Sequence, residues 1–293
     1  MRGATGLISV IVTTYNREDA LAAVLHALAR QSDGDFEVIV ADDGSRPATA
    51  RAIEKARSSF PVPLTHVWHD DRGFQAAEIR NRAVLASSGG YCLFLDGDCI
   101  AFPDFVAAHR RLAEPGAFVC GDRVLLSRDL TERILRTSAN PAAWRSLAFL
   151  GGYLRGEVNR LAPLLRVPLG QLRRRGATRW QGLRSCNIAM WRADLDRVDG
   201  FDARFAGWGR EDSDLAIRLI RSGCRRKDGR FATGVLHLWH PESDRNGLAE
   251  NQSMLNETLM TDRVRAVKGL SALTAADGGG RKESLREPQR AAE

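Results

Sequence analysis

The sequence has 293 residues, of which 44% are hydrophobic and 27% charged, with a net charge of +7, so it can bury a large core as one domain or two closely joined ones. No apolar run approaches the roughly 18 residues of a membrane-spanning helix, and the N-terminus leads directly into a strand-like pattern without a cleavage site, so we expect a cytoplasmic protein. The five cysteines are scattered without a C-x-x-C pair, so we expect reduced thiols that pack in the core.

The first 113 residues alternate between strand-like and helix-like patterns. We predict strands at 7–14, 36–41, 64–68 and 91–95, and helices at 17–31, 48–59, 76–87 and 103–113. The strands are almost continuously apolar, which is typical of a mostly parallel sheet covered by helices on both faces. We therefore predict an α/β fold with a Rossmann-like central sheet, in which ligands bind at the carboxyl ends of the strands.

A polar cluster follows each of these four strands. The clusters are Thr13–Asn16, Asp42–Ser45, His69–Arg72 and Asp96–Asp98. Because the carboxyl ends of parallel strands meet at one edge of a sheet, we expect the clusters to converge on one crevice. The sequence has neither G-x-G-x-x-G after its first strand nor a Walker-type G-K-[ST], so this edge is a poor dinucleotide or P-loop site.

The stretch LFLDGDCI places Asp96 and Asp98 one residue apart, directly after an apolar strand. Two carboxylates at the rim of a core repel each other and lose hydration unless a cation lies between them. One interpretation is an Asp-Gly turn with solvated side chains. The other is a divalent cation that binds carboxylate and phosphate oxygens together, and so holds a diphosphate.

Three segments in order, SVIVTTYNRE, FEVIVADDGS and RGFQAAEIRNRAVLASSGGYCLFLDGDC, resemble the GT-A-fold glycosyltransferases of family 2 over residues 7–125. The resemblance implies a nucleotide-diphosphate sugar as donor. It places Thr13, Tyr15, Asp42 and Asp43 in the nucleoside pocket and turns Arg80 toward the nucleotide or diphosphate. It also gives the diphosphate a divalent metal, usually Mn²⁺ with Mg²⁺ as the second candidate, held by the D-x-D residues Asp96 and Asp98 around Gly97.

A second motif, FDARFAGWGREDSD at residues 201–214, is similar to the G-W-G-x-E-D-x-D signature of galactosyltransferase-type C-terminal regions, as in β-1,4-galactosyltransferases and chondroitin-polymerase-like enzymes. The similarity implies that Trp208 and Glu211 contact the acceptor sugar and that the Glu211–Asp212 pair includes the catalytic base, which we assign to Asp212. A structural alternative is that these acids favour the N-terminus of the helix that follows. Both can hold together. The helix dipole lowers the pKa of a base, so desolvation or a neighbouring acid must then compensate.

The stretch GVLHLWHPE supplies His237 and His240 after a short apolar strand. On a continuous strand this odd spacing points the two rings to opposite faces, so both bind one metal only if the chain turns between them. In the galactosyltransferase-like family a histidine at this strand end completes the metal shell, and the polar run that follows places that role on His240. Imidazole favours Mn²⁺ over harder cations.

The whole charge surplus lies in residues 128–179, which hold eleven Arg and three acidic residues. Arginines alternate there with Leu, Phe, Trp and Tyr, and this segment departs from both resemblances. We favour a monotopic element whose leucines enter the lipid boundary while Arg173, Arg174 and Arg175 contact anionic headgroups. The alternative is a helical insertion that covers the acceptor site. We expect no nucleic acid partner because no motif for one is recognisable.

These patterns divide the chain into four parts. We predict a nucleotide-sugar-binding half at 1–125, a helical basic amphipathic insertion at 126–180, an acceptor-binding and catalytic half at 181–272, and a disordered tail at 273–293.

Together these features predict a metal-dependent inverting glycosyltransferase that moves a hexosyl or N-acetylhexosaminyl group from a UDP-sugar to a hydroxyl of a glycan or glycolipid. The resemblance suggests UDP-galactose, UDP-N-acetylgalactosamine or UDP-glucuronate as donor, and a bacterial surface-polysaccharide or lipid-linked acceptor. The basic segment adds the expectation of peripheral attachment at the inner face of the cytoplasmic membrane. The alternative is a catalytically silent carbohydrate- or lipid-binding module on the same fold, because a fold does not imply activity.

Overall fold

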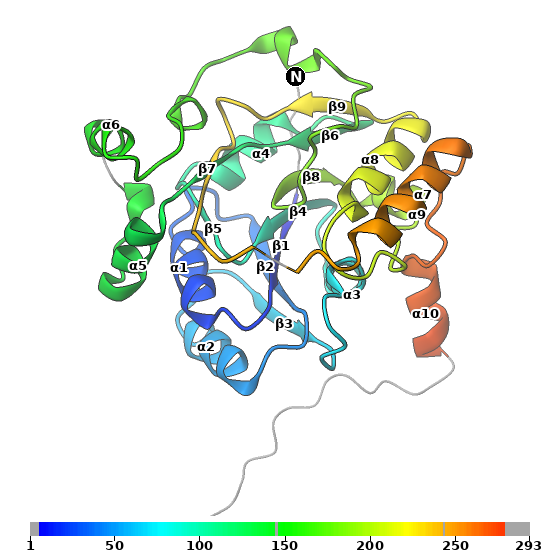
Figure 1. The fold of residues 1–293 in the computed structure, drawn as a ribbon, viewed down its shortest axis with the longest axis horizontal. Coiled ribbons are helices and arrows are strands. Elements are labelled where there is room, and N and C mark those ends of the chain that lie inside the picture. Colours follow the sequence, from blue (N-terminus) through cyan, green and yellow to red (C-terminus); the bar gives the residue numbers. More distant parts are fainter. Residues whose placement is uncertain (1–5, 144–145, 243, 279–293) are drawn as a thin grey trace, which may run out of the picture.

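A seven-stranded sheet forms the centre of the protein, for which a computed structural model describes residues 6–143, 146–242 and 244–278 (Figure 1). The strands follow the order β3-β2-β1-β4-β8-β6-β9. Their bounds are β1 Ile8–Thr14, β2 Phe36–Asp42, β3 Leu64–Trp68, β4 Tyr91–Asp96, β6 Ala117–Cys120, β8 Asn187–Trp191 and β9 Arg225–Asp228. Strand β8 runs antiparallel to both of its neighbours, and the remaining pairs are parallel. The predicted α/β fold with a mostly parallel sheet is confirmed.

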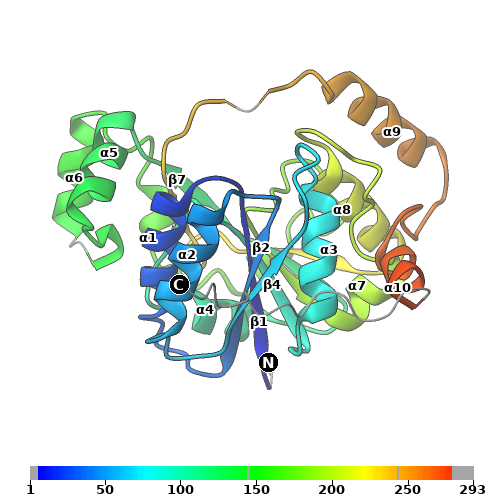
Figure 2. The same ribbon diagram turned by 90° about the horizontal axis from the view of Figure 1, so that it is seen from below.

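Helices cover both faces of the sheet (Figure 2). One face carries α1 (Glu18–Leu28), α2 (Pro47–Arg57) and α4 (Phe105–Leu112), and the other carries α3 (Ala76–Ala86), α7 (Arg192–Val198), α8 (Glu211–Arg221) and α10 (Leu270–Gly278). Side chains alternate between the faces along each strand. In β1, Val10 and Val12 therefore join the core under α1, while Ile11 joins the core under α3. Because both faces are buried, the strand is mostly apolar, and its buried Ser9 hydroxyl donates to Glu37 at 2.7 Å.

A second, three-stranded sheet connects the two halves of the chain. It has the order β5-β10-β7, with β5 at Cys99–Ala101, β10 at Val235–His237 and β7 at Arg123–Leu125. The antiparallel pairing of β10 with β5 places His237 opposite Cys99. This sheet therefore brings a histidine from late in the chain to the acids that follow β4.

The basic segment is helical, as predicted, but its helices are short. It contains α5 (Arg128–Thr137), α6 (Ser146–Leu154) and 3-10 helices at Pro141–Ala143, Ala162–Leu164 and Gly170–Arg174. The Ser127 hydroxyl caps α5 by accepting the Leu130 N–H at 3.2 Å. Helices α5 and α6 lie together at one side of the molecule, at the opposite end from α9 (Leu248–Met260) (Figure 2).

The three consecutive arginines of this segment do not form the exposed row that we predicted for a lipid surface. Arg173 is buried and donates to the carbonyl oxygens of Asp228 and Arg230 at 2.8 and 2.7 Å. Arg174 forms an ion pair with Glu114, and Arg175 lines a cavity. Tertiary contacts thus separate three side chains that are adjacent in the sequence.

The predicted tail begins too early at residue 273. Helix α10 extends to Gly278, and Leu270 and Leu273 are buried against the face that carries α3. The sequence contains few large apolar residues here, but one helical turn brings these two leucines to the same side. The rest of the predicted tail, 279–293, lies outside the described residues.

Two expectations from composition can be compared with the structure. All five cysteines are free and buried, as predicted. Within the described part of the chain, no helix has the length and apolar character needed to cross a membrane.

Candidate active site

The carboxyl ends of β3, β2, β1 and β4 meet at one edge of the sheet, and the predicted polar clusters meet with them. In register, Asp42 lies beside Thr14 on one side and Trp68 on the other, and Asp96 lies beside Thr13. The predicted convergence is therefore confirmed. The side chains come from residues 13–98, and strand pairing alone brings them together.

The two acids after β2 are buried and held by neighbouring groups. Asp42 accepts the Ser45 N–H at 2.9 Å and lies 2.9 Å from His66 Nε2. Asp43 accepts the Gln75 N–H at 2.9 Å and lies 2.8 Å from His69 Nε2. These contacts fix the orientation of both carboxylates before any ligand binds.

Tyr15 lies at the same edge but remains exposed. Its hydroxyl donates to Asp71 Oδ2 at 2.9 Å, while 45% of the residue is accessible. Trp68 is similarly exposed, at 47%. Two aromatic side chains are thus available to a planar ligand beside the buried acids.

Arg80 on α3 joins the donor side of the site to the motif late in the chain. Its Nε donates to Thr13 Oγ1 at 3.1 Å, one terminal nitrogen donates to Asp96 Oδ1 at 3.3 Å, and the other donates to Glu211 Oε1 at 3.1 Å. The guanidinium is buried and also packs over the Phe201 ring. Arg80 therefore holds two carboxylates in place, in addition to the role toward the nucleotide that the resemblance implies.

Gly97 has a packing reason to be glycine. Its N–H donates to the Thr13 carbonyl at 2.7 Å, and a Cβ at this position would lie 2.9 Å from that oxygen and 3.0 Å from Thr14 Cβ. Only glycine allows the turn after β4 to approach β1 this closely. The approach sets the positions of the two flanking aspartates.

Asp98 lies between two histidines. Its Oδ1 is 3.6 Å from His237 Nε2, and its Oδ2 is 3.4 Å from His240 Nε2. Strand β10 ends at His237, so the chain leaves the strand between the two histidines and the opposite-face argument does not apply. Ligand atoms of Asp98, Cys99 and His237 also lie within 4.8 Å of one another. Sequence reasoning favoured His240 alone and missed that His237 reaches the same carboxylate.

The donor set around Asp98 fits a divalent cation. Burial lowers the pKa of His237 to about 4, so the imidazole is neutral and able to bind a metal at neutral pH. Burial also raises the pKa of the Cys99 thiol well above its ordinary value, which keeps it protonated and makes it a poor ligand. One carboxylate with one or two imidazoles leaves coordination positions free, as a metal that also binds a diphosphate requires.

Asp96 differs from Asp98 in its surroundings. Desolvation raises its pKa to about 6, opposed by Arg80 and reinforced by Asp98. Its carboxylate contacts Arg80, whereas Asp98 contacts the histidines. The structure therefore assigns different neighbours to the two acids of the D-x-D pair.

The second motif forms the N-terminus of α8. The backbone immediately before α8 has positive φ at Gly207, Gly209 and Arg210. Asn251 on α9 donates to the carbonyl oxygens of Ala206 and Gly209 at 3.0 and 2.9 Å and so fixes this loop. Trp208 is 39% exposed, and the Arg245 guanidinium lies 5.0 Å from its ring centroid.

Asp212 has the electrostatic surroundings of a base. Desolvation and, next, the charge of Glu211 raise its pKa to about 7, although the Ser213 N–H and Arg80 oppose the shift. A helix N-terminus alone would lower this pKa. Desolvation and the charge of Glu211 therefore compensate for the effect of the helix dipole on the pKa of Asp212, as is needed for a base at this position.

Asp214, the last acid of the motif, has a structural role. It pairs with Arg218 at 2.8 Å, with both side chains fully buried, and it accepts the Thr258 hydroxyl at 2.7 Å. The hydrogen bond from Thr258 ties α8 to α9. Sequence reasoning did not separate Asp214 from the other two acids, although its position one turn before Arg218 is a detectable signal.

Comparison with known proteins agrees with this arrangement. The model of glycosyl transferase family 2 matches residues 9–175, which is more than half of the chain. The chain belongs to this family. The match also includes most of the basic segment, which we expected to lie outside it. A second model, described as the N-terminal domain of galactosyltransferase, matches residues 174–240 and so contains the second motif and both histidines.

Curated relatives include two kinds of glycosyltransferase. A validoxylamine A glucosyltransferase of Streptomyces hygroscopicus subsp. limoneus is 31% identical over 249 residues, covering 80% of this chain and 53% of that protein. A chondroitin synthase of Escherichia coli is 27% identical over 238 residues, covering 74% of this chain and 32% of that protein. The chain thus spans about half the length, or less, of these relatives.

Solved structures share the fold. The mannosyltransferase PcManGT of Pyrobaculum calidifontis, in complex with GDP-Man and Mn²⁺, has a TM-score of 0.56 at 17% identity and covers 94% of this chain and 76% of its own. TarS 1–349 of Staphylococcus aureus, in complex with UDP, has a TM-score of 0.57 at 17% identity and covers 87% of this chain and 65% of its own. The GT-A fold is thereby confirmed.

Proposed function

We propose that this protein is a metal-dependent inverting glycosyltransferase that moves a sugar from a UDP-sugar to a hydroxyl of a glycan or glycolipid acceptor in bacterial surface polysaccharide synthesis. The observation that carries the proposal is the Arg80 bridge, which links Asp96 of the D-x-D pair to Glu211 beside the proposed base. Donor and acceptor chemistry thus share one rigid framework. The activities for which the relatives are named, together with the UDP and GDP-Man complexes among the similar structures, support a nucleotide sugar as donor.

In this proposal Asp212 accepts the proton of the acceptor hydroxyl as its oxygen attacks the anomeric carbon. The attack comes from the side opposite the leaving UDP, so the anomeric centre inverts in one step. Glu211 and Trp208 hold the acceptor sugar, and Arg80 orients the Glu211 carboxylate through their contact at 3.1 Å. Thr13, Tyr15, Asp42 and Asp43 hold the nucleoside.

Asp98, with His237 and His240, would hold Mn²⁺, for which Mg²⁺ is the second candidate. The cation, when bound, offsets the negative charge of the leaving diphosphate. The carboxylate and imidazole donors support Mn²⁺ as the first choice, and the manganese complex of the similar mannosyltransferase agrees with it. Asp96, which Arg80 holds in place, would add a second carboxylate to these metal ligands.

We also propose that α6 attaches the enzyme to the inner face of an anionic membrane. Three of its side chains, Leu147, Leu150 and Leu154, recur at helical spacing and are 75%, 44% and 78% exposed, while Phe149 points into the core. Helix α5 lies beside α6 (Figure 1), and Arg133 of α5 and Arg155 of the turn after α6 both pair with Glu157. This surface replaces the row of Arg173–Arg175 in the membrane hypothesis.

The test of function starts from nucleotide binding. We expect UDP with Mn²⁺ to raise the melting temperature, and the enzyme to hydrolyse a UDP-sugar slowly without acceptor. Asp98→Asn should abolish the manganese-dependent part of UDP binding without unfolding the protein, because it removes a charge and opens no cavity. Asp262→Asn is the matched control, since the Asp262 side chain is exposed and makes no hydrogen bond or ion pair with the described part of the chain.

Two results would contradict the proposal. UDP affinity that is the same with and without Mn²⁺, and the same in Asp98→Asn, would remove the metal assignment. A protein that binds UDP and Mn²⁺ but hydrolyses none of a panel of UDP-sugars, and transfers none of them, would instead be a silent binding module.

A further inference from the structure

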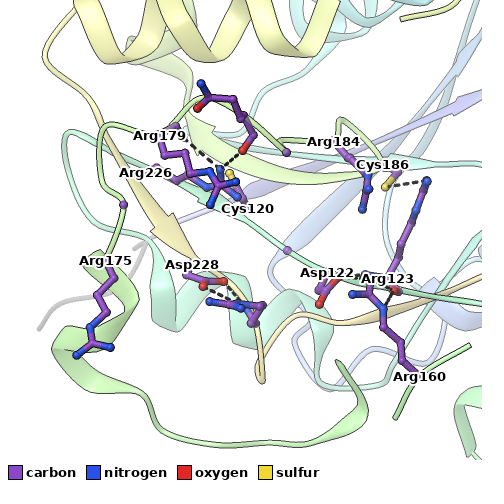
Figure 3. A pocket seen from close by; sticks show the side chains of 15 residues that line it. Cys120, Asp122, Arg123, Arg160, Arg175, Arg179, Arg184, Cys186, Arg226 and Asp228 are labelled. Atoms are coloured by element: carbon purple, nitrogen blue, oxygen red, sulfur yellow. Dashed lines mark hydrogen bonds and ion pairs between the residues drawn. The ribbon is translucent and has the colours of Figure 1, made fainter. Parts of the chain in front are cut away.

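A cavity of about 460 Å³ lies beside the proposed transfer site and is built largely from arginine (Figure 3). Its walls come from the turn between β6 and β7, from β9 and the turn after it, and from the loop at 175–186. None of the residues assigned above to the nucleoside, the metal or the base lines it. The function proposed so far therefore leaves this cavity unexplained.

The charges of the cavity do not cancel. Two of its arginines are neutralised, because Arg160 pairs with Asp122 at 2.6 Å and Arg230 pairs with Asp228 at 2.7 Å. The other five form no ion pair with a carboxylate of the described residues. They are Arg123, Arg175, Arg179, Arg184 and Arg226.

The partners that these five do have are neutral. Arg226 donates to the carbonyl oxygens of Arg179 and Gln181, and Arg123 contacts Cys186 Sγ at 3.6 Å. The side chains of Arg175, Arg179 and Arg184 make no hydrogen bond or ion pair with the described part of the chain, and Figure 3 shows them around the same space. Several guanidinium groups around one cavity repel one another unless an anion lies between them.

The position of the cavity relates it to the acceptor and not to the nucleoside. Nucleoside groups lie over β3, β2 and β1, while the cavity lies over β6 and β9, with β4 and β8 between. Arg123 begins β7, which pairs with the strand that carries His237. Burial lowers the pKa of Arg123, but Cys186, Cys99 and Asp96 raise it by more, so a carboxylate of the acidic site acts electrostatically on an arginine of the cavity. The acidic site thus separates the cavity from the nucleoside.

We propose that this cavity binds a multiply charged phosphate group of the acceptor, such as the diphosphate of a lipid-linked sugar or the phosphate groups of a soluble phosphorylated glycan. The inference rests on the proposed transferase function and specifies its acceptor. A single carboxylate is satisfied by one bidentate arginine. Five uncompensated guanidinium groups instead match a diphosphate, which carries more charge and more acceptor oxygens. A volume of this order is typical of small-molecule sites.

Inorganic pyrophosphate is the first probe. Titration calorimetry in EDTA at physiological ionic strength keeps pyrophosphate from a metal-bridged site, and the carboxylates of the unmetallated acidic site repel it. We expect saturable binding to the wild-type protein. Arg175→Gln/Arg184→Gln should weaken it by about tenfold or more, since both side chains are exposed and removing their charge spares the core.

The matched control is Arg51→Gln/Arg111→Gln, which removes the same charge from two exposed arginines elsewhere. We expect it to bind pyrophosphate like the wild type. No saturable binding by the wild-type protein would overturn the proposal. Equal losses in the two double variants would also overturn it, because they would show an effect of net charge alone.

Transfer assays then identify the source of the phosphate. Three acceptors are compared: a lipid-linked sugar diphosphate in detergent, its short-chain soluble analogue, and the neutral glycan without phosphate. Loss of transfer by Arg175→Gln/Arg184→Gln to both phosphorylated acceptors supports a shared phosphate site, and loss with the lipid-linked acceptor alone assigns it to the lipid source. An equal loss with the neutral glycan would overturn the proposal.

Donor hydrolysis by the wild-type protein is measured in parallel. Its absence would count against the transferase function and would leave the pyrophosphate result standing. The two failures are therefore distinguishable.

Discussion

The two ends of the sheet edge differ in whether their charged side chains are paired within the protein. At the proposed transfer site, four acids contact a cationic side chain, a histidine or a backbone N–H within 3.3 Å: Asp42, Asp43 and Asp96 of the donor side and Glu211 of the acceptor side. On the cavity side, five arginines have no carboxylate partner in the described residues. Electrostatic preorganisation explains the first arrangement, because groups that act on a developing charge work best when already fixed. The positive charge of the arginines in the second arrangement is balanced only when a ligand supplies an anion.

This difference separates residues whose charges are already paired within the protein from residues whose charges are paired only when substrate binds. If it is correct, substitutions within the paired network should affect folding or turnover, and substitutions among the unpaired arginines should affect acceptor binding.

The largest effect should come from the fully buried pair of Asp214 and Arg218. Asp214→Ala leaves a buried guanidinium without its counter-charge, although Arg218 keeps its bonds to the carbonyl oxygens of Val198 and Gly200. We expect the free energy of unfolding to fall by about 3–5 kcal/mol, measured by urea denaturation. Asp262→Ala should change it by less than about 0.5 kcal/mol. A stable Asp214→Ala would mean that the last acid of the motif is functional instead.

Asp212→Asn should leave the fold intact and reduce turnover by roughly a hundredfold or more, the usual scale for loss of a general base. Donor affinity should stay near the wild-type value. Because the pKa of Asp212 is raised to about 7, the active, ionised form grows as pH rises through 7. Wild-type turnover should therefore increase by about tenfold per pH unit below 7 and level off above it. Stopped-assay pH profiles of wild type, Asp212→Asn and Asp262→Asn test this, and an unchanged profile in Asp212→Asn would disprove the assignment.

The sequence predicted the donor side of this comparison much better than the cavity side. All four strands and four helices of the first 113 residues occur where the apolar patterns placed them, because a strand buried on both faces leaves a strong compositional signal. Parallel pairing then fixed which strand ends meet. Residues 126–186 carry no such signal, since their helices are short and their arginines are sorted by tertiary contacts, so that Arg173, Arg174 and Arg175 have three different surroundings.

The positions of the candidate acids were predictable, and their contacts were not. The motifs placed Asp96, Asp98 and Asp212 at or next to strand and helix ends, which is where the structure has them. His66 and His69 were missed as partners of Asp42 and Asp43, because those contacts depend on the pairing of β2 with β3 and on the loop after β3. The second histidine at Asp98 was missed because the end of β10 could not be located to the residue.

Glu211→Gln tests whether Glu211 binds the acceptor while Asp212 acts as the base. Removing the charge next to Asp212 should lower the pKa of the base, because Glu211 is one of the groups that raise it. We expect the turnover profile to shift to lower pH, and the Michaelis constant for the acceptor to rise several-fold while turnover at saturation is largely kept. Steady-state kinetics across pH measure both. If Glu211→Gln abolishes turnover at saturating acceptor, the roles of the two acids are reversed.

The smallest effect concerns α6, where neither protein contacts nor the catalytic network explain the exposed leucines. Leu147→Asp/Leu154→Asp places two charges on the apolar face, so binding to vesicles of phosphatidylglycerol and phosphatidylcholine should fall while donor hydrolysis is kept. Met260→Asp/Val267→Asp is the matched control, since both residues are highly exposed and lie outside the basic segment. Wild-type binding should also weaken with salt, because arginines contribute to it. Vesicle co-sedimentation measures these changes. If the wild-type protein does not bind anionic vesicles at low salt, the membrane hypothesis is wrong and α5 and α6 are better explained as a cover for the acceptor site. The arginine cavity would then be the remaining explanation for the positive charge.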